Sequence, residues 1–370
     1  MGGAGAPPVS LVGKIRTAET QRTLRETEMA SHRSATLTPL AWQQHRLTLL
    51  DQTRLPDCTV YLRPTDYREV VDAIQRLAVR GAPLIGVAGA YGLVLEAFRR
   101  PERRHLLRVA AVIRQARPTA VNLAWAIERL EKIVKDPALP AQELPARLEA
   151  EAELIHREEI VRSQRMGEFG ARLIRSGYRV LTICNAGKLA APGLGTALAA
   201  IYVAHRQGKR VSVFVPETRP LLQGARLTAL ELSRAGIPVT VLTDSMVALT
   251  MPEVDVVLTG ADRIARNGDT ANKVGTYQLA LLARHFRKPF YPVAPVSTFD
   301  RAARTGLDIP IEYRDCRELM FCGGRRIAPG GVSFHNPAFD VTPAELITGI
   351  VTDQGILKPP LGRAIRQLLR

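Results

Sequence analysis

This sequence is poor in cysteine, in aromatic residues and in long apolar runs, and each shortage excludes a class of protein. Its 370 residues include four cysteines, which are widely spaced and form no CxxC pair: Cys58, Cys184, Cys316 and Cys322. This spacing argues against a disulfide framework and a zinc site, and it favours a reducing cytoplasm. No uninterrupted apolar run approaches the ~20 residues of a membrane-spanning helix. The N-terminus also lacks the charged and apolar regions of a secretory signal.

Acidic residues are scarce relative to basic ones. The chain has 51 Lys and Arg against 35 Asp and Glu, which gives a formal net charge of +16. Such an excess raises the hypothesis of nucleic-acid binding. The basic residues are dispersed, however, and the densest run, Arg99 to Arg104, lies between two predicted helical segments. Aromatic residues make up only 5% of the chain, and no RNP-type pattern or zinc finger is present. We therefore expect an anionic small-molecule substrate rather than a nucleic-acid or membrane partner.

Three regions differ in composition and periodicity. Residues 1–38 begin Gly/Pro-rich and continue polar, which predicts a flexible N-terminal extension. Residues 39–176 carry mainly helical spacing and predict a mainly helical N-terminal domain. Residues 177–370 alternate short apolar runs with helical stretches, which predicts a Rossmann-like C-terminal catalytic domain.

The alternation in the third region sets the fold class. Five short runs rich in β-branched residues predict buried strands, and helical stretches separate most of them. Their apolar character is continuous rather than alternating, as in parallel strands covered on both faces. The sequence thus predicts an α/β protein with a doubly wound parallel sheet. The predicted strands are Val180–Cys184, Arg210–Val215, Val239–Thr243, Val254–Leu258 and Phe290–Ala294.

The most informative segment follows the fourth predicted strand. Within 258–277 the chain carries a carboxylate, an amide and cations just beyond the strand end, namely Asp262, Arg263, Asp269, Asn272 and Lys273. Ligands of open parallel sheets bind at the carboxyl edge of the strands, so this set predicts a site for a polar, anionic substrate. Taken singly, Asp262 could be a helix cap or a partner of Arg263, and Lys273 could lie on a helix surface.

Cys184 ends the first predicted strand on the same sheet edge. A free cysteine can be a small buried hydrophobe, or it can act as a general acid or base. The glycine-rich turn that follows is neither a GxGxxG fingerprint nor a Walker loop, which argues against a NAD or nucleotide site. Arg80 and Arg117 each lie near a proline at a helix boundary, and they could be surface charges or a phosphate clamp.

Several longer motifs resemble one family. From about Pro39 to Pro360 the chain resembles the S-methyl-5-thioribose-1-phosphate isomerases, sugar-phosphate isomerases of methionine salvage that are related to the regulatory subunits of translation initiation factor 2B. The motifs are Asp51-Gln-Thr-Arg-Leu-Pro56, Val79-Arg-Gly-Ala-Pro-Leu-Ile-Gly86, Arg117-Pro-Thr-Ala-Val-Asn-Leu123, Glu217-Thr-Arg-Pro-Leu-Leu-Gln-Gly-Ala-Arg-Leu-Thr228, Thr243-Asp-Ser245, Gly260-Ala-Asp-Arg-Ile-Ala265, Asn267-Gly-Asp-Thr-Ala-Asn-Lys-Val-Gly-Thr-Tyr277 and Asn336-Pro-Ala-Phe-Asp-Val-Thr-Pro343.

The resemblance implies an aldose–ketose isomerase that forms a homodimer and needs no metal or organic cofactor. It implies that Asp262 opens the sugar ring and that Cys184 assists hydrogen transfer from C2 to C1, either as a proton acceptor or beside a hydride shift. The phosphate and sugar contacts it implies are Arg80, Gly81, Ala82, Arg117, Gln223, Asn272 and Lys273.

One loop departs from the family pattern. The family usually has His-Cys-Asn-Thr-Gly followed by Leu-Ala-Thr, whereas this chain has Ile183-Cys-Asn-Ala-Gly187 followed by Lys188-Leu-Ala-Ala-Pro192. Lys188 could meet a second anionic group or face solvent. The departure leaves ribose 1,5-bisphosphate and 5-deoxyribose 1-phosphate as alternative substrates. A non-catalytic phosphosugar sensor or regulatory subunit is the alternative of another class.

Overall fold

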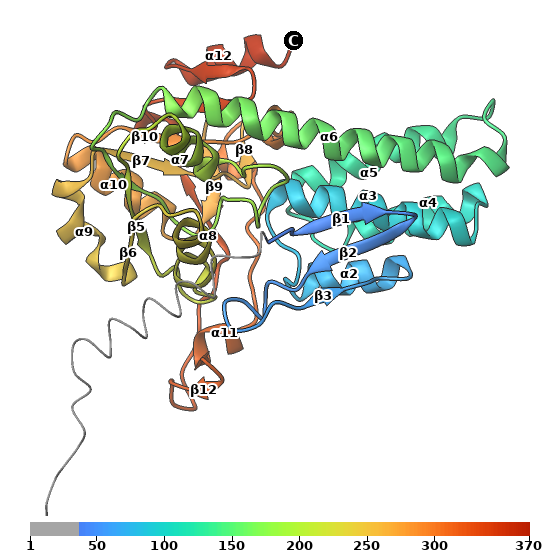
Figure 1. Ribbon diagram of the computed structural model, residues 1–370, viewed down its shortest axis with the longest axis horizontal. Helices are drawn as coiled ribbons and strands as arrows, with labels where there is room; N and C mark the ends of the chain where they lie inside the picture. The colour runs from blue at the N-terminus through green and yellow to red at the C-terminus, as the bar shows by residue number, and fades with distance from the viewer. Residues whose placement is uncertain (1–36) are drawn as a thin grey trace, which may run out of the picture. The chain divides into compact units, whose positions relative to one another are not determined.

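The computed structural model describes residues 37–370, which form one compact unit. The expected N-terminal extension, residues 1–38, lies outside the described residues except for its last two. Of these, Leu37 is buried and packs with Leu50 and Leu55. In Figure 1 a helical half and a sheet-containing half lie side by side, and one long helix extends along both.

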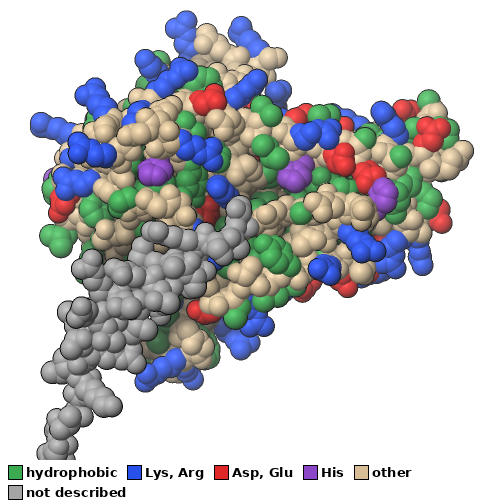
Figure 2. Space-filling model, in the orientation of Figure 1, with side chains coloured by type: hydrophobic (Ala, Val, Ile, Leu, Met, Phe, Trp, Pro, Cys, Tyr) green, Lys and Arg blue, Asp and Glu red, His purple; other side chains and the backbone are tan. Residues whose placement is uncertain are grey.

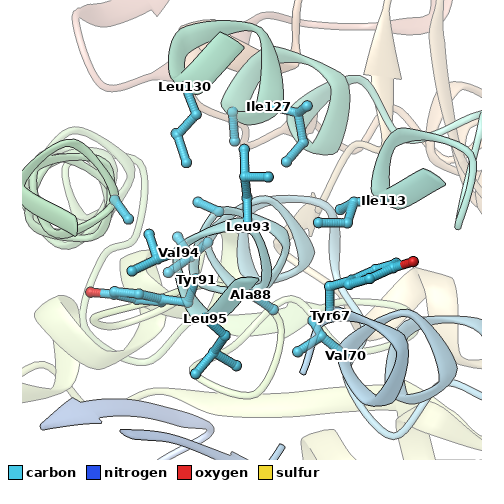
Figure 3. Packing of buried hydrophobic residues seen from close by; sticks show 14 of the residues in the cluster. Tyr67, Val70, Ala88, Tyr91, Leu93, Val94, Leu95, Ile113, Ile127 and Leu130 are labelled. Atoms are coloured by element: carbon cyan, nitrogen blue, oxygen red, sulfur yellow. The ribbon is translucent and has the colours of Figure 1, made fainter. Parts of the chain in front are cut away.

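The helical half is built around one apolar helix, α3. Every residue of α3 from Ala82 to Ala97 is buried, as expected of a helix that is apolar on all sides. Figure 3 shows Leu93 and Val94 of this helix among Ile113, Ile127 and Leu130 from neighbouring helices. The helices of this half are α2 (Tyr67–Gln75), α3 (Ala82–Arg99), α4 (Arg103–Arg114), α5 (Val121–Lys135) and α6 (Leu144–Ala171).

α3 is also the one helix among the described residues that is long and apolar enough to cross a membrane. Because 89% of its apolar window is buried inside the protein, it is accounted for as the central core helix of this half.

An antiparallel sheet opens this mainly helical region, and its third strand confirms the short strand that the sequence predicts at Thr59–Leu62. Strands β1 (Leu40–Gln43), β2 (Arg46–Leu50) and β3 (Tyr61–Leu62) pair in sequence order. The β1–β2 turn consists of Gln44 and His45, both with positive φ, as in the two-residue turns that match strand twist. Neither residue is the Gly or Asn that usually marks such a turn, so the hairpin has no strong local signal.

The second half contains the predicted parallel sheet, and the fold class is confirmed. Its five strands are all parallel and run in the order β10-β7-β4-β5-β6. The strands are β4 (Arg179–Leu181), β5 (Ser212–Pro216), β6 (Val239–Leu242), β7 (Val256–Thr259) and β10 (Phe290–Pro292). The helices between them are α7 (Ala197–Arg206), α8 (Ala229–Arg234), α9 (Val247–Thr250) and α10 (Thr276–His285).

The strand order creates a switch point beside β4. The chain proceeds from β4 through β5 to β6 on one side, and it returns to β7 and β10 on the other. The loops that leave β4 and β7 therefore diverge from neighbouring strands, which is where open α/β sheets bind their ligands. Cys184 follows β4 and Asp262 follows β7.

A small antiparallel sheet covers this carboxyl edge. Its strands are β8 (Arg263–Ile264), β9 (Thr270–Lys273) and β13 (Phe339–Thr342), in the order β13-β9-β8. Asn272 and Lys273 thus lie on a strand, opposite Asp340 and Phe339, so the reading of Lys273 as a helix-surface residue is wrong. The remaining strands and helices are β11 (Phe321–Cys322), β12 (Arg325–Arg326), β14 (Ile350–Thr352), β15 (Gly355–Leu357), α11 (Arg317–Met320) and α12 (Leu361–Leu368).

One helix begins later than the sequence predicts. Helical spacing from Arg219 to Ala235 predicts a helix between the second and third strands, but this helix begins only at Gly224, as a single π-turn that leads into α8. The residues before it do not continue the helix, because Thr218 and Leu222 adopt positive φ. Helix α6 packs on the helical core through Leu148 and on α7 through Gly167, where a Cβ would lie 2.8 Å from Val203. α6 therefore contacts both halves, and the domain boundary expected at residues 176–177 stays a prediction.

Candidate active site

One cavity collects the nine residues that the resemblance implies for catalysis and substrate binding, but not Arg263 or Asp269, which the sequence also singled out. Arg263 pairs with Asp300, and Asp269 accepts from the N–H groups of Gly306 and Ala344. The cavity lies where the carboxyl edge of the parallel sheet meets the start of α3 in the helical half. Segments that are far apart in the chain contribute to it, from the Arg80 loop to β13. Its lining includes Cys184, Asp262, Arg80, Gly81, Ala82, Arg117, Gln223, Asn272 and Lys273.

Cys184 is held in an unusual backbone conformation. Its φ is +59°, a left-handed conformation that costs a non-glycine residue roughly 1–2 kcal/mol. The surroundings fix it from both sides, because its N–H donates to Thr218 Oγ1 at 3.0 Å and its carbonyl accepts from Thr228 Oγ1 at 2.6 Å. The residue is 9% exposed and its thiol is free. Backbone strain that is fixed this firmly is typical of functional positions.

Asp262 lies at the neighbouring strand end. Its N–H donates to the carbonyl of Ala271, which ties the loop after β7 to β9. Burial raises the pKa of the Asp262 carboxyl, although the charges of Lys273, Arg117 and Arg80 act in the opposite direction. A carboxyl group of this kind retains its proton to higher pH than an exposed aspartate, so it can serve as a general acid.

Arg80 and the start of α3 form a cationic wall. Both terminal nitrogens of Arg80 donate to Asn185, at 2.6 Å to Oδ1 and 2.7 Å to the backbone carbonyl. Gly81 caps α3 with φ +93°, and a Cβ there would lie 2.3 Å from the carbonyl oxygen of Ala190. Only glycine permits this close approach. Pro83 has no N–H and the N–H of Leu84 donates to the carbonyl of Ala190, so this end of α3 offers an anion the N–H groups of Gly81 and Ala82 beside the Arg80 guanidinium.

Sequence reasoning missed Arg314, a further cation of the cavity, and Glu312, the carboxylate that pairs with it. Arg117 Nη2 donates to Glu312 Oε2 at 3.1 Å, and Arg314 Nη1 donates to Glu312 Oε1 at 2.8 Å. Arg314 also lines the cavity. Burial favours the neutral form of Glu312, but the charges and hydrogen bonds of both arginines lower its pKa overall. Arg117 and Glu312 are 195 positions apart in the sequence, so no local pattern indicates that they pair.

The wall formed by β9 adds an amide and a buried cation. Lys273 is 8% exposed, and its ammonium lies 5.1 Å above the Phe339 ring. Burial lowers the pKa of Lys273, opposed by the charges of Cys184 and Asp262. Asn272 Nδ2 donates to Thr276 Oγ1 at 3.0 Å. Gln223 is 5% exposed, and its Oε1 has no hydrogen-bond partner within the protein, which suits an oxygen that receives a ligand hydroxyl.

The basic excess is not concentrated around this cavity alone. Figure 2 shows Lys and Arg scattered over the visible face, with acidic side chains among them. The expectation that nucleic acid is not a partner stays a prediction. Among residues 37–370, no group of three or more His, Cys, Asp or Glu side chains is arranged to hold a metal ion.

Comparison with known proteins identifies the family of this chain. The model of the initiation factor 2 subunit family matches residues 78–359. The chain belongs to the initiation factor 2 subunit family. Within this family a methylthioribose-1-phosphate isomerase from Desulforudis audaxviator is 53% identical over 336 residues, which cover 89% of this chain and 96% of that protein. The resemblance drawn from the motifs is confirmed.

Two solved structures of the family carry different names. The 5-methylthioribose 1-phosphate isomerase of Pyrococcus horikoshii OT3 is 40% identical with a TM-score of 0.83, and the match covers 92% of this chain and 97% of that one. A protein described as translation initiation factor eIF-2B subunit delta from A. fulgidus is 43% identical with a TM-score of 0.78, covering 90% and 100%. The fold of the family is thus shared by proteins named as enzymes and as translation factors.

The loop that departs from the usual family pattern has an unexpected orientation. Lys188 does not line the cavity: its N–H donates to Glu231 Oε2 at 2.7 Å and its ammonium lies 5.1 Å from the centre of the Tyr202 ring. Ile183, in contrast, is a cavity residue and is 3% exposed. The departure therefore makes the cavity wall more apolar and adds no cation to it.

Proposed function

We propose that this chain is an aldose–ketose isomerase that converts 5-methylthioribose 1-phosphate to 5-methylthioribulose 1-phosphate in methionine salvage. The observation that carries the proposal is the pairing of Cys184 and Asp262 at adjacent strand ends, inside a cavity with a cationic wall. The name of the 53% identical relative supports the same reaction.

Ring opening is the first chemical problem. The anomeric carbon carries a phosphate ester, so the ring cannot open spontaneously to a free aldehyde. Asp262 donates its proton to the ring oxygen as the bond from that oxygen to C1 breaks, and the electron pair stays on the oxygen. The raised pKa of Asp262 supports this role, because the acid must be protonated when the substrate binds.

Hydrogen transfer from C2 to C1 is the second problem. In one route the Cys184 sulfur accepts the C2 proton to give a phosphoenol, and the proton returns at C1 while the C2 hydroxyl gives its proton to the Asp262 carboxylate. In the other route hydride moves directly from C2 to C1, and Cys184 handles the proton of the C2 hydroxyl. The buried position of Cys184 and the apolar Ile183 beside it support both routes, because each benefits from exclusion of water.

The remaining cavity residues bind the phosphate and the sugar. We assign the phosphate to Arg80, the α3 N-terminus at Gly81 and Ala82, and Arg117. These groups combine a positive helix end with guanidinium donors. Lys273, Asn272 and Gln223 border the same space and supply donors and acceptors for phosphate oxygens and hydroxyl groups.

The composition of the cavity wall supports a substrate with an apolar C5 substituent. Ile183, Ala186, Ala261 and Phe339 line the cavity, whereas Lys188 is engaged with Tyr202. A thioether methyl group gains from apolar surface, and a second phosphate would lose its hydration there. We therefore favour the methylthio sugar over ribose 1,5-bisphosphate, with 5-deoxyribose 1-phosphate as the alternative of similar polarity.

A non-catalytic regulatory or sugar-sensing role is the second candidate. The structure named as an initiation factor subunit, at 43% identity, is the observation that favours it. Such a protein would bind a phosphosugar in the same cavity without turnover. We also propose a homodimer in the cytoplasm, a prediction that size-exclusion chromatography with light scattering and cell fractionation would test.

The deciding experiment is direct. The purified protein is incubated separately with 5-methylthioribose 1-phosphate, ribose 1,5-bisphosphate and 5-deoxyribose 1-phosphate, and ketose formation is followed by proton NMR. We expect the methylthio sugar to be converted fastest. Binding of a sugar phosphate without conversion of any of the three would favour the sensor instead.

A further inference from the structure

Ile183 separates two cavities. It lines the catalytic cavity, and it also lines a second one, here called the α10 cavity, whose lining is mostly apolar. The α10 cavity lies against α10 and reaches the partly exposed side chains of Tyr277 and Leu281. Its apolar wall includes Pro216, Val247, Val274 and Leu279. Within the described residues, Ile183 is the side chain that both cavities share.

The residues on either side of Cys184 face two different ends of the catalytic cavity, one cationic and one apolar. Asn185 binds Arg80, and Ala190 lies against Gly81, so the residues after Cys184 face the cationic wall. Ile183, just before Cys184, extends the other way: a Cβ at Gly275, the residue preceding α10, would lie 3.1 Å from its Cδ1. The left-handed backbone at Cys184 accompanies this change of direction.

A pentose 1-phosphate with a thioether at C5 has one charged end and one apolar end, which match the cationic wall and the apolar end of the cavity. The phosphate is on C1, and the C5 substituent projects from C4 on the other side of the ring oxygen. With the phosphate at the Arg80 wall and the reacting carbons at Cys184 and Asp262, the C5 substituent points toward the apolar end of the cavity. We propose that Ile183 is the specificity-determining residue that limits the length of the C5 thioether substituent, by closing the catalytic cavity off from the α10 cavity.

This inference rests on the proposed isomerase function and goes beyond it. Replacing Ile183 with alanine removes three carbon atoms from the partition and joins the two cavities. A longer alkylthio chain can then pass the partition and contact Val247, Val274 and Leu279. Enzymes discriminate a single added methylene group in an apolar pocket by about 10–200-fold, so a joined cavity should change chain-length selectivity measurably.

The test compares kcat/KM for 5-methylthio-, 5-ethylthio- and 5-n-propylthioribose 1-phosphate. We expect the wild-type protein to prefer the methylthio substrate to the n-propylthio one at least about tenfold, and Ile183→Ala to reduce that ratio at least about tenfold. Ile183→Val, a smaller opening that conserves the β-branched shape, should relax the ethylthio ratio first and keeps the test available if the alanine variant does not fold. Val247→Ala enlarges the α10 cavity without breaching the partition, so its ratios should equal those of the wild type.

The outcomes separate this inference from the function on which it rests. A merely structural role for Ile183 would lower kcat/KM for all three substrates equally and leave the ratios unchanged, which overturns the inference while the isomerase function stands. If Ile183→Val and Ile183→Ala both fold, turn over substrate and keep the wild-type selectivity ratios, the inference is likewise overturned while the isomerase function stands. Failure of the wild-type protein to convert the methylthio substrate overturns both.

Discussion

The carboxylate of Glu231 supports the catalytic loop through Asn185. Glu231 Oε1 accepts from Asn185 Nδ2 at 2.8 Å, and the carbonyl groups of Asn185 accept both terminal nitrogens of Arg80. The same carboxylate accepts from the N–H of Lys188 at 2.7 Å and from the Tyr202 hydroxyl at 3.0 Å. It is 6% exposed, so each of these bonds forms away from solvent. One buried side chain on α8 thereby orients the thiol loop and a phosphate-binding arginine together.

Glu231→Gln is expected to weaken substrate binding more than turnover. The NH2 of the glutamine would face the N–H of Lys188 or the Nδ2 of Asn185, both of which are donors, so at least one charge-assisted hydrogen bond is lost. Asn185 is then held less firmly, and Arg80 loses its fixed orientation. Hydrogen bonds to charged groups contribute about 1.5–3 kcal/mol, which corresponds to a rise in KM of roughly 10–100-fold. Steady-state kinetics test this, and the exposed Glu345→Gln variant is the control for loss of one negative charge. An unchanged KM in folded Glu231→Gln would remove the positioning role.

Asp262 and Cys184 should each be required for turnover. General acid–base catalysis contributes about 10²–10⁴-fold, so Asp262→Asn and Cys184→Ala should each lower kcat by at least about a hundredfold while binding of sugar phosphate persists. In the wild-type protein kcat should fall as pH rises through the raised pKa of Asp262, because the acid form is lost. The exposed Asp57→Asn variant should retain both the rate and the pH profile. Near-normal turnover in either site variant would refute the assignment.

Glu312 should tune the pKa of Asp262 from across the cavity. Its negative charge raises the pKa of Asp262, which burial already raises, and it neutralises Arg117 and Arg314. In Glu312→Gln the alkaline limb of the kcat profile should therefore move to lower pH. Arg314 keeps its bonds to Glu318, but Arg117 loses its carboxylate partner, which should destabilise the fold by about 1–3 kcal/mol.

Glu318→Gln is the matched control for that prediction. Glu318 accepts from Arg314 Nε at 2.8 Å, but it is not among the charges that contribute most to the pKa shift of Asp262. Its loss should lower the melting temperature without moving the alkaline limb. Identical pH profiles for Glu312→Gln and the wild type would show that the Glu312 charge does not reach Asp262.

The sequence specifies the parallel sheet well, because its signal is local. Continuous β-branched runs and the helical stretches between them predict the five strands with boundaries that shift by a few residues, as at β4 and β5. The β1–β2 hairpin escapes prediction because its turn residues, Gln44 and His45, are not turn formers. Strand β9 escapes because its partner, β13, follows more than 60 positions later.

The candidate site was predictable mainly through family motifs. Local chemistry alone left Cys184 as either a buried hydrophobe or a catalytic thiol, and it left Asp262 as a possible cap. The resemblance supplied nine residues, and the fold brings all nine to one cavity, although their roles stay predictions. Glu231, Glu312 and Arg314 escaped because their contacts depend on tertiary structure, such as the 46-residue separation between Asn185 and Glu231.

Lys188 should have no part in substrate choice. Its ammonium lies over the Tyr202 ring, so Lys188→Ala removes a cation–π contact of about 0.5–1 kcal/mol and keeps the backbone bond to Glu231. The ratio of kcat/KM between 5-methylthioribose 1-phosphate and ribose 1,5-bisphosphate should stay within about twofold of the wild type. Arg80→Ala, which alters the cationic wall itself, should raise KM for both substrates. A selective loss of bisphosphate turnover in Lys188→Ala would mean that the ammonium turns into the cavity.

Asp340 caps α10 next to the catalytic cavity, and its ionisation should be visible in stability. Its carboxylate accepts from the N–H groups of Gly275 at 2.6 Å and Tyr277 at 3.1 Å. Burial nevertheless raises the pKa of Asp340 from 3.8 to about 6, against these bonds and the charge of Lys273. The folded protein therefore binds this proton more tightly than the unfolded chain does. The resulting stabilisation is complete below about pH 3.8 and is lost as pH rises through about 6.

Asp340→Asn removes this linkage, and Asp66→Asn is its matched control. The free energy of unfolding of the wild type relative to Asp340→Asn should fall by on the order of 3 kcal/mol between pH 3 and pH 7, measured by urea denaturation at a series of pH values. Asp66 is the N-cap residue of α2 and also accepts from two backbone N–H groups, those of Arg68 and Glu69. These bonds and the charges of Arg68 and Arg99 outweigh the effect of burial, so the pKa of Asp66 is lowered. The free energy of unfolding of the wild type relative to Asp66→Asn should therefore increase as pH rises. Opposite slopes for two carboxylates that each accept from two N–H groups at a helix start would show that burial, rather than these bonds, decides the direction of the Asp340 pKa shift. Parallel slopes would contradict it.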